Sequence, residues 1–396
     1  MSVSAASAST TSGLADNQVA FHIPSLDGIR AAAVLLVFFS HIGFRGSLPG
    51  NFGVTVFFFL SGYLITTLLR REFAATGLIN LRAFYLRRVF RIMPPMYLFL
   101  AFAVLLTLTG ALQGTVRGDA LALQLVHLTN FRVIHSGWWE GLAPGTWIYW
   151  SLAVEEHFYL LFPLAYIVLL RLRASVWAQV SALLAVCAMV LAWRFVLVLV
   201  LNASEDRTYM ATDTRIDSIL FGCVLGIFNN PAFGENRISE TTLKWLWSPL
   251  AIVVLLLSFG VADERFKETI RYTMQGIALF PLFILAISHP EWGPIRLLNL
   301  RIVAFVGILS YSAYLVHPTV IYAVEQHTSW SQYPQAGLAL AITMTLAYAV
   351  YTVVEKPCAQ LRRQLSGPGV VKKPEGATAT DSRSSLSQPT QGHSLL

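Results

Sequence analysis

The sequence has 396 residues, of which 55% are hydrophobic and only 12% are charged. Soluble domains carry about 25% charged residues, so this chain has roughly half of the charge that a water-facing surface needs. That shortage excludes an ordinary soluble enzyme, a disordered protein and a fibrous one. The net charge of +7 comes mainly from arginines beside long apolar runs, which a membrane explains better than nucleic acid does. We therefore expect an integral membrane protein in contact with lipid and without a nucleic-acid partner.

Ten apolar runs are candidates for membrane-crossing helices, because a hydrocarbon core about 30 Å thick needs about 20 helical residues. In chain order they cover residues 29–44, 53–69, 94–112, 146–170, 177–201, 214–228, 246–261, 272–287, 303–324 and 336–354. No lysine or arginine precedes the first run, so it lacks the basic flank of a signal peptide and we expect it to be retained. The sequence thus predicts an all-α, polytopic integral membrane helical bundle with about ten transmembrane helices.

Polar segments flank these runs. Residues 1–22 are rich in Ser, Ala and Thr, and residues 366–396 are rich in Gly, Pro, Ser, Thr and Gln. Both have little apolar surface to bury, so we expect two disordered tails around a transmembrane domain over residues 23–365. Arginine and lysine are more frequent in the loops on the side of both termini, which places both termini in the cytoplasm.

The informative residues are polar ones in or beside the apolar runs, because a charged side chain at mid-bilayer costs at least about 2.5–3.5 kcal/mol. Asp27, Arg30 and His41 belong to one helix face: positions 30 and 41 are separated by three turns plus roughly 20°. A histidine there suits a general base. The alternative is an imidazole that only packs against a neighbouring helix through a hydrogen bond.

Two further motifs follow along the chain, one built around a small residue and one rich in arginine. Ser61 and Tyr63 flank a glycine that lets either another helix or a ligand approach closely. Arg87, Arg88 and Arg91 are helically spaced and interleaved with aromatic residues. They can bind phosphates, or they can be orienting charges whose side chains extend to lipid headgroups.

Three later spans carry polar side chains, each with a structural role as the alternative. These are Ser151, Glu155, Glu156 and His157 in the fourth, Arg215 and Asp217 in the sixth, and Tyr314 and His317 in the ninth. Adjacent helical residues point about 100° apart, so Glu155 and Glu156 do not both face one cavity. Ser151 and Glu155 share a face. The proline after His317 frees a backbone carbonyl, which is tolerated where a helix packs on protein or lines a cavity.

In this order the motifs resemble those of the membrane-bound acyltransferase-3 family, multi-span O-acyltransferases of bacterial surface polysaccharides and related acceptors. The likeness covers residues 26–357, with blocks at 26–41, 53–66, 84–94, 150–163, 215–222 and 310–318. Six blocks in order are more specific than any one alone. Thr55 stands where Asp is common in the family, and His157 follows the glutamates where Gln is more usual, which leaves the acceptor preference open.

The resemblance implies an enzyme that moves an acyl group, with acetyl expected, from acetyl-CoA or another acyl-CoA to a hydroxyl of a cell-surface carbohydrate or small molecule. The implied catalytic residues are His41 as general base with Arg30, Asp27 and Glu155. The residues expected to bind the donor are Arg87, Arg88, Arg91, Ser61 and Tyr63. Those expected to bind the acceptor are Ser151, Glu156, Arg215, Asp217, Tyr314 and His317. No permanently bound cofactor and no metal are expected, and both direct transfer and a covalent acyl-serine stay open.

The alternative function is a multi-span transporter or flippase of a glycan or lipid-linked substrate, which would move its substrate without acyl-CoA. The sequence shows no inverted repeat of the kind common in transporters, and the six ordered blocks also count against this alternative. For either function we expect a multi-pass protein of the bacterial inner membrane.

Overall fold

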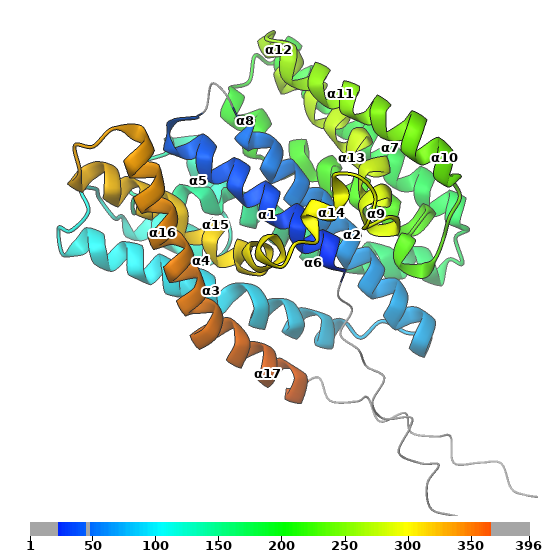
Figure 1. Cartoon of the computed structure of the whole chain (residues 1–396), viewed down its shortest axis with the longest axis horizontal. Coiled ribbons are helices and arrows are strands. Elements are labelled where there is room, and N and C mark those ends of the chain that lie inside the picture. Colours follow the sequence, from blue (N-terminus) through cyan, green and yellow to red (C-terminus); the bar gives the residue numbers. More distant parts are fainter. Residues whose placement is uncertain (1–22, 45–47, 366–396) are drawn as a thin grey trace, which may run out of the picture.

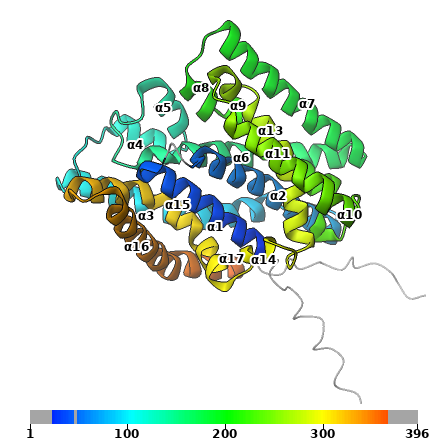
Figure 2. The same ribbon diagram turned by 45° about the horizontal axis from the view of Figure 1, so that its top comes forward.

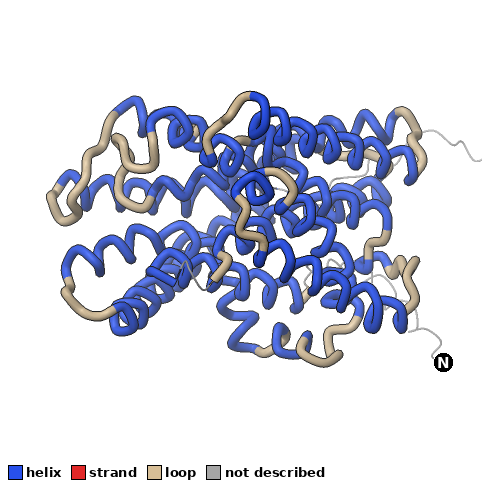
Figure 3. The backbone as a smooth tube through the Cα atoms, turned by 90° about the horizontal axis from the view of Figure 1, so that it is seen from above, coloured by secondary structure: helices blue, strands red, loops and turns tan. Residues whose placement is uncertain are grey.

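The computed structural model describes residues 23–44 and 48–365, and within these ranges the chain forms helices and loops but no strands (Figure 3). Ten helical segments are long and apolar enough to cross a membrane, so the predicted all-α polytopic bundle is confirmed. The chain is therefore a multi-pass integral membrane protein. The two predicted tails, 1–22 and 366–396, lie outside the described residues.

The first five segments, some of them built from consecutive helices, are as follows. They are α1 (Pro24–Phe39) with η1 (Ser40–Phe44), α2 (Gly50–Thr76), α3 (Leu81–Leu108), η2 (Thr146–Tyr149) with α6 (Trp150–Arg171), and α7 (Val176–Phe195) with η3 (Val196–Val200). Two short helices, α4 (Gly118–Leu125) and α5 (Thr129–Ser136), lie in the loop between α3 and η2.

The second five segments complete the bundle. They are α8 (Glu205–Met210) with α9 (Thr212–Phe228) and η4 (Pro231–Phe233), α10 (Glu240–Thr242) with η5 (Leu243–Trp247) and α11 (Ser248–Gly260), α13 (Arg271–Ser288), α15 (Arg301–His327), and α16 (Gln332–Val350) with η6 (Tyr351–Glu355) and α17 (Lys356–Leu365). The loops on either side of α13 hold α12 (Glu264–Glu268) and α14 (Ile295–Leu298).

The third span begins earlier than the apolar run at residue 94 suggests. Helix α3 begins at Leu81, where the side chain of Asn80 accepts a hydrogen bond from the backbone amide of Ala83 (3.0 Å). It then continues through Pro94 and Pro95. An arginine-rich segment can remain helical beyond the apolar core, and neighbouring helices compensate for prolines within a span.

The centre of the bundle is formed where α2 and α9 touch along their backbones (Figures 1 and 2). A Cβ atom at Gly62 would overlap the carbonyl oxygen of Ile219, and one at Gly222 would overlap that of Phe59. The small residues after Ser61 therefore serve helix packing, one of the two roles their sequence left open. The α2 span and the α8–α9 span are each 72% buried, whereas the last span, residues 332–362, is 22% buried and lies at the periphery.

The two ends of the bundle differ in chemistry. The described chain enters and leaves on the same side, where the grey tails begin in Figure 1. We call this the basic end; there Arg70 of α2 pairs with Glu235 after α9 (2.8 Å). At the opposite, aromatic end, the indole of Trp138 donates to the carboxylate of Asp206 (3.0 Å).

Candidate active site

Two cavities lie in the bundle, and Val54 and Tyr314 line both of them. The histidine cavity, of about 760 Å³ at the aromatic end, has as its polar and aromatic lining His41, Trp138, Trp139, Trp147, Trp150, Glu205, Asp206, Tyr209, Lys267, Arg271 and Gln275. The arginine cavity, of about 460 Å³ toward the basic end, has as its charged lining Asp27, Arg30, Arg88, Arg91, Glu155, Glu355 and Arg362. The two cavities therefore lie on either side of Val54 and Tyr314, which we call the junction.

The backbone around His41 departs from a regular helix. His41 lies in η1, a widened turn of the π type, a form that occurs frequently at functional sites. Within this turn the helix is kinked at Gly43, whose φ of +99° favours glycine. The side-chain amide of Gln332 donates to the carbonyl oxygen of Ile42 (3.2 Å) and so satisfies one backbone acceptor in the turn. This turn places His41 at the wall of the histidine cavity.

His41 pairs with His317, a fully buried residue of α15. Nδ1 of His41 lies 2.9 Å from Nε2 of His317, and the two rings are nearly parallel, with an angle of 10°. Nδ1 of His317 lies 2.8 Å from the carbonyl oxygen of Tyr314, which can only accept a hydrogen bond. In neutral His317 the proton is therefore on Nδ1, and Nε2 accepts a hydrogen bond from Nδ1 of His41. This arrangement leaves the basic lone pair of neutral His41 on its Nε2.

The arginine cavity gathers four guanidinium groups from three separate parts of the chain. Arg30 comes from α1, Arg88 and Arg91 come from α3, and Arg362 comes from α17. Asp27 forms an ion pair with Arg30 one turn away on α1. Guanidinium groups are well suited to phosphate oxygens because their donors match them in pairs.

Three side chains in this cavity form a closed hydrogen-bonded triangle. Ser61 donates to one oxygen of Glu155 (2.9 Å), and the hydroxyl of Tyr159 lies 2.9 Å from the other oxygen and 3.0 Å from that of Ser61. These hydrogen bonds hold Glu155 in the arginine cavity. The side chain that contacts His41 is that of His317. The i, i+4 spacing in the sequence places Tyr159 on one face with Ser151 and Glu155, but Tyr159 was not among the expected site residues.

A second pair of hydroxyls marks the junction between the cavities. The oxygen atoms of Ser151 and Tyr314 lie 2.6 Å apart. The ring of Phe57 packs edge-on against Tyr314, with ring centroids 5.8 Å apart. Ser151 lines the arginine cavity and Tyr314 lines both. The hydroxyl of Tyr314 is therefore a polar group at the junction between the two cavities.

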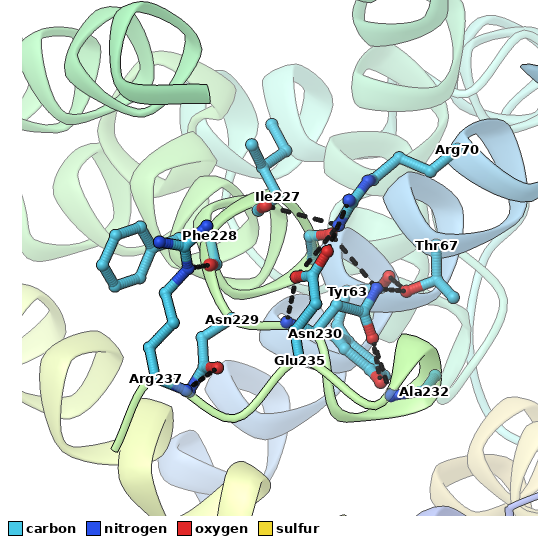
Figure 4. A network of polar contacts seen from close by, with 11 residues as sticks. Tyr63, Thr67, Arg70, Ile227, Phe228, Asn229, Asn230, Ala232, Glu235 and Arg237 are labelled. Atoms are coloured by element: carbon cyan, nitrogen blue, oxygen red, sulfur yellow. Dashed lines mark hydrogen bonds and ion pairs between the residues drawn. The ribbon is translucent and has the colours of Figure 1, made fainter. Parts of the chain in front are cut away.

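Two residues expected to bind the donor lie outside the arginine cavity. Arg87 forms an ion pair with Glu72 of α2 (2.8 Å) and does not line the arginine cavity, although it lies one turn from Arg91 on α3. Tyr63 donates to Asn230 (2.8 Å) and belongs to a polar network at the basic end. The members of this network are Tyr63, Thr67, Arg70, Asn230 and Glu235, drawn in Figure 4. The network ties α2 to the loop after α9, so Tyr63 has a structural partner there.

Four residues expected to bind the acceptor also line neither cavity: His317, which is buried beside His41, and the three described next. Asp217 is fully buried in an ion pair with Arg194 of α7 (2.7 Å). Arg215 is fully buried with its guanidinium 3.9 Å from the centre of the Tyr272 ring. Glu155 lines the arginine cavity, whereas Glu156 does not. Adjacent positions on α6 point about 100° apart, so the two glutamates face different surroundings.

The environment of Arg215 includes Thr55, one of the two positions where the sequence was expected to differ from the family pattern. A guanidinium nitrogen of Arg215 donates to the hydroxyl of Thr55 (3.1 Å). The rings of Phe58, Tyr209 and Tyr272 also surround this cation within 5.4 Å. A hydroxyl and aromatic faces thus contact the buried guanidinium.

Several residues at these sites were missed in the sequence. Arg194 interrupts an apolar run, so the cost of burying its charge would have marked it. Arg362 and Glu355 follow the last apolar run and carried no comparable signal. Among the described residues no group of three His, Cys, Asp or Glu side chains is placed to hold a metal ion.

Comparisons with known proteins agree with the resemblance. A family model described as an acyltransferase domain matches residues 23–354. The peptidoglycan O-acetyltransferase OatA of Listeria monocytogenes is 28% identical over 359 residues, which cover 85% of this chain and 56% of that protein. A Bacillus subtilis protein, YrhL, provisionally named a peptidoglycan O-acetyltransferase, is 30% identical over 351 residues, covering 85% and 55%. This chain therefore spans little more than half the length of these relatives. No solved structure matches the chain.

Proposed function

We propose that this chain, which belongs to the membrane-bound acyltransferase-3 family, transfers an acetyl group from acetyl-CoA to a hydroxyl of a cell-envelope carbohydrate. The pairing of His41 with His317 beside an open cavity is the observation that carries this proposal. It supplies an oriented general base, which is the group that hydroxyl acylation needs. The match to an acyltransferase domain over residues 23–354 favours this use of the histidine pair over a role in transport.

The donor would occupy the arginine cavity. Acetyl-CoA has an anionic nucleotide end, and Arg88, Arg91 and Arg362 offer guanidinium groups to its phosphates. Arg30 lies in the same cavity and is oriented by Asp27. The thioester would extend to the junction at Val54 and Tyr314, where the acceptor can approach from the other side.

In the proposed reaction the acceptor hydroxyl transfers its proton to Nε2 of His41 as its oxygen attacks the thioester carbonyl carbon. The C–O bond forms, and the carbonyl electron pair moves to oxygen; for Tyr314 to donate a hydrogen bond to this oxygen, its hydroxyl would release its contact with Ser151. Collapse of this intermediate breaks the C–S bond, and the proton on His41 passes to the departing CoA thiolate. Positioned proton transfer contributes about 10²–10⁴-fold to such a rate.

This proposal also gives the protein an orientation. Acyl-CoA is made in the cytosol, so the basic end would face the cytoplasm, in agreement with the positive-inside rule. The histidine cavity would then open toward the outside of the bacterial inner membrane. The names of the relatives, which describe peptidoglycan O-acetylation, support a cell-wall carbohydrate as the acceptor.

The test uses the full chain in lipid nanodiscs with radiolabelled acetyl-CoA and a peptidoglycan disaccharide. We expect His41→Ala to bind acetyl-CoA as the wild type does but to lose acetyl transfer, and Arg30→Ala to lose donor affinity. The matched controls are His327→Ala and Arg82→Ala, both exposed residues outside the two cavities. Wild-type transfer by His41→Ala would overturn the general base, and absence of acetyl-CoA binding would favour the transporter.

A further inference from the structure

The wall of the histidine cavity beside His41 is aromatic. The rings of Trp138 and Trp147 meet edge to face with centroids 4.9 Å apart, and Trp147 also meets the ring of His41 at 5.1 Å. Trp139 lies 6.3 Å from Trp147 and is 60% exposed. Indole rings at a membrane surface are common as interfacial anchors. These three, however, line a cavity and extend from its exposed edge to the proposed base.

Polar atoms on the same lining lack partners among the described residues. The indole nitrogen of Trp147, Nε of Arg271 and the amide oxygen of Gln275 are each buried without a hydrogen-bond partner. All three residues line the histidine cavity, and the side chains of Trp147 and Gln275 belong to residues only 7% and 2% exposed. A buried polar group without a partner is costly. Because each of these atoms has almost no accessible surface, a ligand in the cavity would bond to them only after a small movement of their side chains.

Two carboxylates complete the lining. Glu205 and Asp206 lie at the beginning of α8 on the cavity wall. Asp206 accepts from the indole nitrogen of Trp138 (3.0 Å), which fixes that ring. Burial and the negative charges of Glu205 and Glu264 raise the pKa of nearby Glu268, while Lys267 and Arg271 bring positive charge to the cavity lining. Carboxylates readily accept hydrogen bonds from the hydroxyls of a ligand, whereas a ligand with a hydrocarbon chain would offer them no hydrogen-bond donor.

We infer that the histidine cavity contains a saccharide subsite, in which a pyranose ring stacks on Trp139 and Trp147 while its hydroxyls bond to Gln275, Arg271 and Glu205. This inference rests on the proposed function, because it supplies the place where the acceptor waits beside His41. The cavity volume of about 760 Å³ falls within the range of about 300–1,000 Å³ typical of ligand sites. The apolar faces and alternating hydroxyls of a sugar match both the indole rings and the polar side chains of the lining.

The first experiment measures binding without any acyl donor, so that it does not depend on acetyl transfer. Calorimetry would use the full chain in nanodiscs and a disaccharide of N-acetylglucosamine and N-acetylmuramic acid. We expect Trp139→Ala to raise the dissociation constant at least about tenfold, and Trp139→Phe to raise it less, because the phenyl ring still stacks. The control, Trp330→Ala, replaces another exposed tryptophan (55% exposed) outside the lining and should bind like the wild type.

The second experiment compares the same variants in the transfer reaction. Trp139→Ala should raise the KM for the disaccharide, with kcat and acetyl-CoA affinity within about twofold of wild type. Glu205→Gln should also weaken saccharide binding; unchanged affinity would overturn the polar part of the subsite. If Trp139→Ala binds and reacts with the disaccharide as the wild type does, the subsite is wrong while the proposed acyl transfer stands. Trp139-dependent saccharide binding without acetyl transfer would support the subsite and contradict the proposed function.

Discussion

The buried pair of Asp217 and Arg194 gives the sharpest test of a structural role against a substrate-binding one. Both side chains are fully inaccessible to solvent, and Asp217 accepts from Arg194 (2.7 Å) and from the backbone amide of Ser218 (2.8 Å). Asp217→Asn keeps the shape and can keep the bond to Ser218, but it leaves the cation of Arg194 without its carboxylate. Breaking a buried ion pair by removing one partner costs about 3–5 kcal/mol.

We therefore expect Asp217→Asn to lower the free energy of unfolding by about 3–5 kcal/mol, measured by denaturant-induced unfolding followed by tryptophan fluorescence. The loss falls short of the full desolvation cost because Arg194 still donates to the carbonyl of Thr214 (2.9 Å) and to the hydroxyl of Thr273 (2.6 Å). The matched control is Asp119→Asn, which breaks an exposed pair with Arg117 and should leave stability unchanged. Wild-type stability together with a raised KM for the acceptor would refute our reasoning and restore Asp217 to the substrate site.

Three further outcomes follow from the contacts described above. His317→Leu should lower kcat by about 10²–10⁴-fold at unchanged acetyl-CoA affinity, and His317→Gln, whose amide oxygen can accept from His41, should restore part of the rate in the same assay. Arg91→Ala should raise the dissociation constant for acetyl-CoA in calorimetry, whereas Arg87→Ala should not, because Arg87 is paired outside the cavity; equal effects would contradict this distinction. Burial alone would raise the pKa of Glu235, but the hydrogen bond from Arg70 and the backbone amide of Asn230 hold that pKa below its ordinary value. The stabilisation from this carboxylate is therefore present above the ordinary carboxyl pKa and is lost as the pH falls through the lowered one; Glu235→Gln should flatten the acid side of a thermal-unfolding profile against pH.

The membrane fold could be predicted from the sequence because hydropathy alone marks ten spans. Helix boundaries could not, since polar turns such as the one that begins at Leu81 continue a helix without adding to its hydropathy. The last span shows the same effect: η6 and α17 extend it beyond the apolar run and carry Arg362 to the arginine cavity.

The candidate site was predictable only where a buried charge made a residue conspicuous. Arg88 and Arg91 were identified together with Arg87, but the sequence does not show that Glu72 of another helix engages one of the three. His41 and His317 were both identified, yet they are separated by 276 positions and only the packing of α1 against α15 brings them together. Pairing across distant helices is a tertiary property that no local spacing encodes.

The narrow junction at Val54 and Tyr314 has a consequence for the energetics of the cell. If the proposed function is right and the two cavities open to opposite sides of an energy-coupling membrane, the protein is at risk of becoming a leak for protons and ions. The wall that the cavities share is formed by an apolar side chain and by a phenol already engaged with Ser151 (2.6 Å). The proposed reaction would require this wall to admit an acyl group while it excludes hydrated ions. Chemical transfer and electrical insulation would thus depend on the same two residues, so a variant that accepts bulkier acyl groups would also weaken the membrane's capacity to hold its gradient.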